Sequence, residues 1–166
     1  MYVYSFKPTL PLSLSSNPIM GPFTEQEQEQ ISQAISDAEK STSGEIRIAV
    51  DKHCSGEAYE KAISYFSKLG MDKTSRHNGV LIYLAYEDHK FAIVGDSGIN
   101  KVVPEDFWET TKVAMKAHFA SGNLALGIIA GVVLAGEKLS TFFPSQNDDI
   151  NELPNDIIFM DQNKTV

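Results

Sequence analysis

Three residues with oxygen-bearing side chains stand at the predicted ends of strands. Glu45 opens one strand, Asn78 directly precedes a second, and Asp96 follows a third between two glycines. If the first two strands are parallel and the third returns antiparallel, these ends meet at one edge of a sheet, within reach of Asp106. Carboxylate and amide oxygens are the hard donors that Ca²⁺ and Mg²⁺ prefer. The spacing therefore predicts a weak divalent-cation site, with Ca²⁺ or Mg²⁺ as the cofactor.

A second acidic group is expected at the opposite edge of the same sheet. It contains Asp51, at the end of the first of these strands, and Glu87 and Asp88 in a hairpin turn. Because Asp in turns commonly bonds the local backbone, the spacing alone favours Asp88 as a turn residue. Asp96 has two open interpretations, since its flanking glycines fit either a presented ligand or a tight turn.

Other arrangements that support catalysis or metal binding are not matched. The sequence has no Gly-x-Ser-x-Gly elbow, phosphate-binding glycine loop, His-x-x-x-His pair or Rossmann fingerprint. Residues Gly95–Gly98 resemble the nucleophile loop of trypsin-like proteases, but Ile99 breaks the match and the predicted fold is wrong for that class. Cys54 is the one cysteine, and its neighbour His53 does not complete a zinc set.

Composition limits the partners and the compartment. The chain has 166 residues, a net charge of -8 and a pI near 4.9. This charge disfavours nucleic acid and anionic lipid, which attract clustered Lys and Arg. Three prolines interrupt the apolar N-terminal stretch, which also has no basic start, so we expect a disordered leader rather than a signal peptide. The apolar run Leu124–Ala135 is too short to span a bilayer. We expect a soluble cytoplasmic protein without a membrane anchor.

The elements that position these residues follow from periodicity and capping signals. Thr24 and Glu27 form a capping box before a helical apolar stripe. A strictly alternating strand follows, and later a continuous apolar run typical of a central strand. The predicted helices are Thr24–Glu39, Gly56–Leu69, Pro104–Phe119 and Asn123–Phe142, the predicted strands are Glu45–Asp51, Val80–Tyr86 and Phe91–Val94, Gly95–Val103 is a loop, and Ile157–Phe159 is a possible edge segment.

These elements predict an α/β fold, a three-layer α/β/α sandwich on a small mixed β-sheet. We divide the chain into a disordered leader over residues 1–22, the α/β/α domain over 23–145, and a partly docked C-terminal tail over 146–166.

Five stretches together resemble the TPM domain family, over most of the chain from Thr24 to Phe159. They are Thr42–Ile48, Asn78–Tyr83, Asp88–Ile99, Asp106–Trp108 and Asn151–Pro154. The resemblance implies a compact α/β/α domain, with the divalent-metal binding and weak acid phosphatase activity known for some members. It implies metal ligands at Glu45, Asn78, Asp88 and Asp96.

The sequence departs from the commonest family pattern in two respects. His77 stands where many members have an acid, which removes one potential oxygen ligand. The signal peptide and C-terminal membrane helix of many bacterial members are not matched.

Three functions are consistent with these residues. The first is a metal-binding accessory or scaffold module, and the second is a weak metal-assisted phosphatase. The third is a structural or protein-interaction domain without a metal site, in which Trp108 and nearby aromatic residues form core or a patch for an unknown protein partner.

Overall fold

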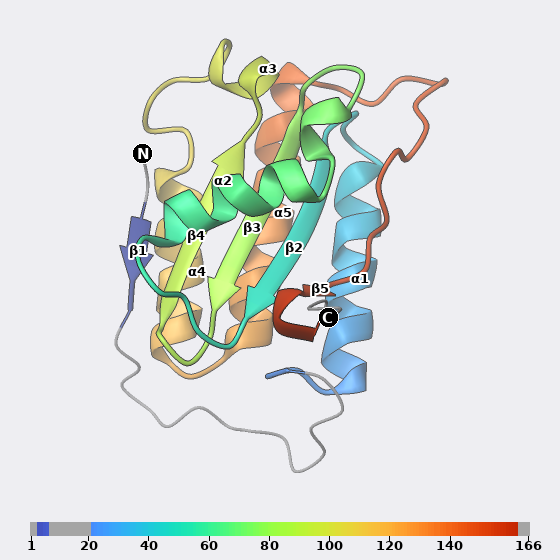
Figure 1. Cartoon of the computed structure of the whole chain (residues 1–166). Coiled ribbons are helices and arrows are strands. Elements are labelled where there is room, and N and C mark those ends of the chain that lie inside the picture. The colour runs from blue at the N-terminus through green and yellow to red at the C-terminus, as the bar shows by residue number, and fades with distance from the viewer. Residues whose placement is uncertain (1–2, 7–20, 163–166) are drawn as a thin grey trace.

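A mixed sheet forms the centre of the molecule in the computed structural model, which describes residues 3–6 and 21–162 (Figure 1). Its five strands have the order β1-β4-β3-β2-β5. The strands are β1 (Val3–Ser5), β2 (Glu45–Asp51), β3 (Gly79–Ala85), β4 (Lys90–Gly95) and β5 (Ile158–Phe159). The parallel β2–β3 pair and the antiparallel β3–β4 hairpin confirm the predicted core of the sheet.

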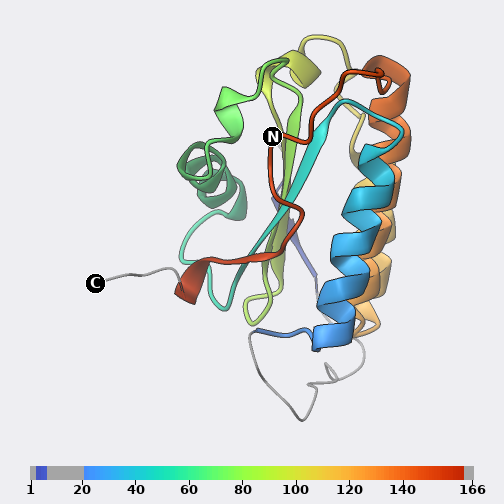
Figure 2. The same ribbon diagram turned by 90° about the vertical axis from the view of Figure 1, so that its right-hand side faces the viewer.

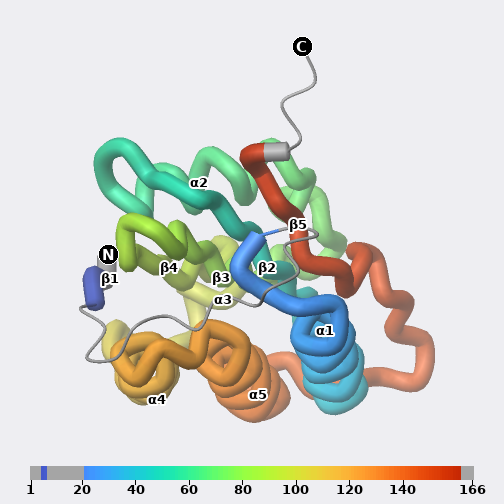
Figure 3. The backbone as a smooth tube through the Cα atoms, turned by 90° about the horizontal axis from the view of Figure 1, so that it is seen from below, coloured from blue at the N-terminus to red at the C-terminus, as the bar shows by residue number. Residues whose placement is uncertain are grey.

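Helices cover both faces of the sheet (Figures 2 and 3). The helices α1 (Glu25–Glu39), α4 (Glu109–Ala120) and α5 (Leu124–Phe142) pack on one face, and α2 (Ala58–Lys68) packs on the other. Two apolar cores result, one under the three-helix layer and one under α2. The predicted three-layer α/β/α sandwich is therefore confirmed. A short α3 (Ser97–Asn100) and two single turns, η1 (Met71–Lys73) and η2 (Met160–Gln162), complete the elements.

Local signals position most elements as predicted. Thr24 caps α1, with its Oγ1 3.1 Å from the amide of Glu27, and the Glu27 carboxylate accepts from the Thr24 amide at 2.8 Å. Gly70 has a φ of 69° just after α2, the left-handed geometry that favours glycine. The tail segment Ile158–Phe159 does dock, as a parallel edge strand on β2.

The polar face of β2 is buried, although its alternating sequence suits a half-exposed strand. Ile46, Ile48 and Val50 face the three-helix layer, while the other face of β2, with its three charged residues, lies under α2 and the C-terminal segment. The charged residues are Glu45, Arg47 and Asp51. Figure 2 shows the C-terminal segment passing from the end of α5 along the sheet to β5. The buried carboxylates at the two ends of β2 thus need partners from elsewhere in the chain.

Glycines let α5 pack closely on its neighbours. A Cβ added at Gly127 would lie 2.3 Å from the ring of Phe119, and one at Gly136 would lie 2.7 Å from the Cβ of Ala38. By length and composition α5 could also cross a membrane. In this fold nine of its residues are buried between α1, α4 and the sheet, as core.

Three predictions about boundaries are wrong in part. The leader expected to be disordered over residues 1–22 contributes β1 and the buried ring of Phe6, because the edge of β4 offers both a strand and a pocket; residues 7–20 lie outside the described residues. The expected loop Gly95–Val103 contains α3, because Asp96 caps it. The third helix begins at Glu109, not Pro104, because turns over Pro104–Trp108 let both Phe107 and Trp108 reach the core.

Candidate functional site

The strand ends that were predicted to share one edge of the sheet do meet there, as three backbone segments. Glu45 donates its amide to the carbonyl of Asn78 at 3.4 Å, and Asp96 donates its amide to the carbonyl of Gly79 at 2.9 Å. Gly98 donates to the carbonyl of His77 at 2.9 Å. Strand ends and loop are therefore locked together at the α3 end of the sheet (Figure 1).

Asp96 presents a carboxylate with one uncommitted oxygen. Its Oδ1 accepts from the amide of Ser97 at 2.6 Å. Its Oδ2 is buried with no hydrogen-bond partner, and the ring Nδ1 of His77 lies 3.4 Å away. The side chain as a whole is only 10% exposed. A buried carboxylate oxygen without a donor is costly, so this oxygen is the edge's strongest candidate for a ligand.

The glycine after Asp96 is required by a close approach. A Cβ at Gly98 would lie 2.4 Å from the carbonyl oxygen of His77. His77 itself has a φ of 50°, an uncommon conformation for a residue with a side chain. The glycine loop is therefore a tight turn, and the interpretation of Asp96 as a ligand stays a prediction.

Asn78 is structural on the contacts that it makes. It is 1% exposed, and its side-chain amide donates to the hydroxyl of Ser43 at 3.2 Å. Its carbonyl accepts from the amide of Glu45, so it ties the segment before β2 to the start of β3. The residue lies at the predicted edge, next to Gly79, whose carbonyl accepts from the amide of Asp96.

Glu45 is committed to the C-terminal segment. Its two carboxylate oxygens accept from the amides of Glu152 at 2.8 Å and Leu153 at 3.3 Å. Burial raises its pKa, and the two amide bonds oppose that rise. The carboxylate is thus an anchor for the tail, a role that only the course of the tail reveals.

Asp88 lies at the opposite end of the sheet from the other three predicted ligands. Strand pairing places its turn beyond Ala85 and Lys90, about 20 Å along the seven-residue strands from Glu45. Its carboxylate accepts from the ring of His53 at 2.9 Å and from the amide of Cys54 at 2.7 Å. The hydrogen bond from His53 lowers the pKa of Asp88. These contacts describe a turn residue, and the four predicted ligands do not form one group.

Two buried acids were not among the predicted ligands. Glu39, at the end of α1, accepts from the amide of Ile46 at 2.9 Å, and burial raises its pKa to about 7. Asp51 accepts from the hydroxyls of Tyr65 at 2.6 Å and Tyr83 at 2.9 Å, and burial raises its pKa also. Asp51 was expected only in an acidic group with Glu87 and Asp88. Its tyrosine partners lie 14 and 32 residues away, and no local spacing links them to it.

Within residues 3–6 and 21–162, no three His, Cys, Asp or Glu side chains lie close enough together to share a metal ion. A cation at Asp96 would need backbone carbonyls, amide oxygens and water for its remaining ligands. Mg²⁺ in particular retains several waters and uses one or two carboxylates. The donor set at Asp96 fits such weak binding and does not fit a zinc centre.

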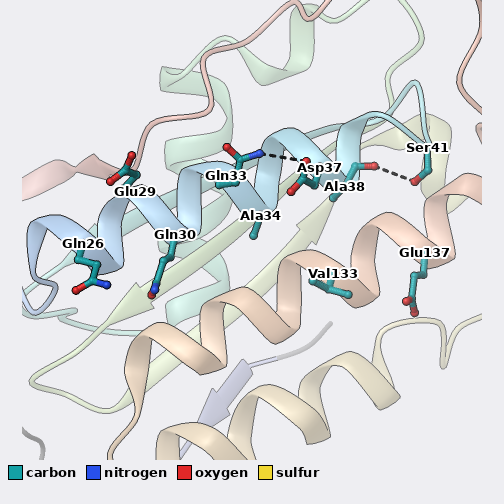
Figure 4. Close-up of a pocket in the computed structure, with 10 residues that line it drawn as sticks. All are labelled: Gln26, Glu29, Gln30, Gln33, Ala34, Asp37, Ala38, Ser41, Val133 and Glu137. Carbon is teal, nitrogen blue, oxygen red and sulfur yellow. Dashed lines mark hydrogen bonds between the residues drawn. The ribbon is translucent and has the colours of Figure 1, made fainter.

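A separate groove of about 690 Å³ lies between α1 and α5 (Figure 4). Asp37 in this groove accepts from the Gln33 amide, and Ser41 donates to the carbonyl of Ala38. The groove holds no histidine, cysteine or arginine. Its lining residues are Gln26, Glu29, Gln30, Gln33, Ala34, Asp37, Ala38, Ser41, Val133 and Glu137. It is an open groove between two helices, and none of the four predicted ligands lines it.

The fold and its glycine-loop edge define a class of α/β/α domain that is found in known proteins. A family model described as the TPM domain matches residues 20–138. The chain belongs to the TPM domain family. It is similar to the BA42 protein of the psychrophilic bacterium Bizionia argentinensis, solved by NMR, with 45% identity and a TM-score of 0.81 over 87% of this chain and 99% of that chain. No curated protein sequence matches it.

Proposed function

We propose that the chain is a TPM domain that binds a divalent cation, Ca²⁺ or Mg²⁺, weakly at Asp96 and acts as an accessory or scaffold module. The observation that carries this proposal is the buried Oδ2 of Asp96, which has no hydrogen-bond partner. A hydrated cation would supply the missing charge compensation at this oxygen. The negative net charge also favours a cation over nucleic acid as the partner.

His77 competes with a cation in this proposal. Its Nδ1 is 3.4 Å from Asp96 Oδ2, and a protonated ring would form an ion pair there. A cation at Oδ2 would therefore have to displace the His77 ring from this oxygen.

The contacts favour binding over phosphatase chemistry. A metal-assisted phosphatase needs a cationic group to hold phosphate beside the metal. Arg76, the arginine nearest to Asp96 in the sequence, bonds Gln146 at 2.7 Å and lies 3.7 Å from Asp149. Trp108 and Phe107, which a purely interaction-based function could have used, are buried in the core.

The test is an amide NMR titration with Ca²⁺ and then Mg²⁺ on the wild type, Asp96→Asn and Glu29→Gln. Glu29 is an exposed acid on α1, so its variant controls for the loss of a charge. We expect shifts at His77–Gly79 and Gly95–Ile99 that Asp96→Asn loses and Glu29→Gln keeps. Shifts that survive in Asp96→Asn, or none at millimolar metal, would refute the proposal.

A further inference from the structure

The outer edge of β4 is covered by β1, which lies outside the family-matched part of the chain. The strand β1 pairs with Lys90–Ala92 of β4, whereas the TPM match begins at residue 20. Within the matched residues of this chain, β4 is the outermost strand on this side. In this chain the edge is partly filled by the chain's own N-terminal residues.

Phe6 shows that this edge includes a pocket for an aromatic ring. Its side chain is 2% exposed, with ring centroids 5.0 Å from Phe119, 6.4 Å from Phe91 and 5.2 Å from His89. Its amide donates to the carbonyl of His89 at 3.0 Å. Without Phe6, apolar rings of α4 and β4 would face the open edge.

The turn beside this pocket is held by contacts within the domain. His89 has a φ of 53°, and its carbonyl accepts from the amide of Phe6. The preceding Asp88 fixes the turn through its bonds to His53 and to the amide of Cys54. The pocket thus belongs to the domain and is not created by Phe6 alone.

The edge continues beyond the part that β1 covers. Among the described residues, β1 pairs no farther along β4 than Ala92. Next to Ile93 and Gly95 lies a hollow of about 470 Å³, whose lining also includes Tyr59, Asn100 and Trp108. A strand longer than β1 would run from the Phe6 pocket into this hollow.

We propose that the β4 edge is a binding site for an extended peptide that carries a phenylalanine, and that residues 3–6 are its displaceable resident. The peptide would lie antiparallel to β4, with its phenylalanine in the Phe6 pocket and its N-terminal part in the hollow beside Gly95. Strand addition obtains affinity from main-chain hydrogen bonds and specificity from such side-chain pockets. This site does not depend on the cation proposal.

Displacement is feasible because the resident segment is short and separately tethered. It makes three residue pairs with β4 and has one fully buried ring among the side chains described. Holding these four residues in one conformation costs conformational entropy, and this cost offsets much of what the contacts contribute. Fourteen residues separate Phe6 from Gly21, so the segment can leave the edge without pulling on α1.

The test uses the full-length chain and a fluorescent peptide with the sequence of residues 1–8. Anisotropy is measured with the wild type and with Phe6→Ala, using a second peptide with alanine in place of its phenylalanine. We expect Phe6→Ala to bind the first peptide about tenfold more tightly than the wild type, because its own segment competes less. The alanine peptide should bind neither protein. Equal binding of the two peptides, or no binding to Phe6→Ala, would overturn the proposal.

A second measurement does not require the variant to fold. Excess peptide is added to the isotope-labelled wild type, and amide shifts are followed. We expect the amide signals of the displaced Val3–Phe6 to move with the phenylalanine peptide only; unchanged signals there would overturn the proposal. Sedimentation tests the other occupant: a wild-type dimer that Phe6→Ala loses would mean that a second copy's strand fills the edge, and would overturn a peptide partner.

Discussion

The two ends of β2 carry buried carboxylates with different partners. The Glu45 carboxylate accepts hydrogen bonds from two backbone amides of the C-terminal segment. The Asp51 carboxylate accepts hydrogen bonds from two tyrosine hydroxyls, one on α2 and one on β3. One carboxylate ties the tail to the sheet, and the other ties a helix layer to it. Both acids serve the fold, Asp51 through its Oδ2, while its Oδ1 is buried without a hydrogen-bond partner, as is Oδ2 of Asp96. Burial of an acid is therefore weak support for a ligand site. Asp96 differs in its place in the glycine loop, where the ring of His77 lies 3.4 Å from its Oδ2.

The largest effect is expected at the tyrosine end of β2. Asp51→Ala would leave the hydroxyls of Tyr65 and Tyr83 buried without their acceptor, at a cost of about 3–5 kcal/mol in unfolding free energy. Urea unfolding measures this loss. In a Tyr65→Phe, Tyr83→Phe background, the same change should cost much less, because no hydroxyl is then stranded. An equal cost in both backgrounds would show that the Asp51 bonds contribute little.

A smaller and more local effect is expected at the tail end. Glu45→Ala should cost about 1–3 kcal/mol, because the amides of Glu152 and Leu153 lose their acceptor. Amide exchange should accelerate at those two residues first. Glu152→Ala is the matched control. It removes a side chain that accepts a hydrogen bond from exposed Ser75, but the backbone amide of residue 152 can still donate to Glu45. Equal losses in the two variants would contradict an anchoring role for Glu45.

The pH dependence of stability should reflect Glu39, which lies near the Glu45 end. Burial raises its pKa from 4.5 to about 7, so the folded state binds the proton more tightly than the unfolded state. Stability is then highest below pH 4.5 for this group and falls as the pH rises through 7. After allowance for solvent screening, the loss is roughly 1–2 kcal/mol.

Glu39→Gln should flatten this part of the curve of unfolding free energy against pH. Glu29→Gln, on the exposed side of the same helix, should leave the curve unchanged. If Glu39→Gln keeps the wild-type slope, the slope arises from Glu45 or Asp51, whose pKa values burial also raises. Combining Glu39→Gln with Glu45→Gln would then distinguish the two ends of β2.

Local sequence patterns predicted the elements, whereas the partners of the acids at the ends of β2 depend on residues far away in the chain. The capping box at Thr24, the alternation in β2 and the apolar run of β3 are local patterns, and each predicted its element. The partners of Glu45 are 107 and 108 residues away, and no periodicity encodes a contact of that range. The predicted edge was placed correctly, but the course of the tail decided what Glu45 does there.

Two other differences have physical causes that are visible only in three dimensions. The prolines at positions 8, 11 and 18 made the N-terminal region resemble a disordered leader, yet Phe6 finds a ring pocket at an open strand edge. Pro104 fits the first turn of a helix, but burial of two consecutive aromatic side chains favours turns there instead. In both cases tertiary burial of aromatic rings outweighs a local backbone signal.

The smallest effect on stability, and the sharpest contrast with β2, is expected at Asp96. Asparagine retains the cap of α3, so Asp96→Asn should change unfolding free energy by less than about 0.5 kcal/mol without metal. With free Ca²⁺ at ten times its dissociation constant, the wild type should gain about 1.4 kcal/mol, and the variant should gain nothing. Thermal melts with and without metal measure both. A large loss without metal would place Asp96 with Glu45 and Asp51, as an acid that serves the fold, because a ligand carboxylate with an uncommitted oxygen contributes little until the cation binds.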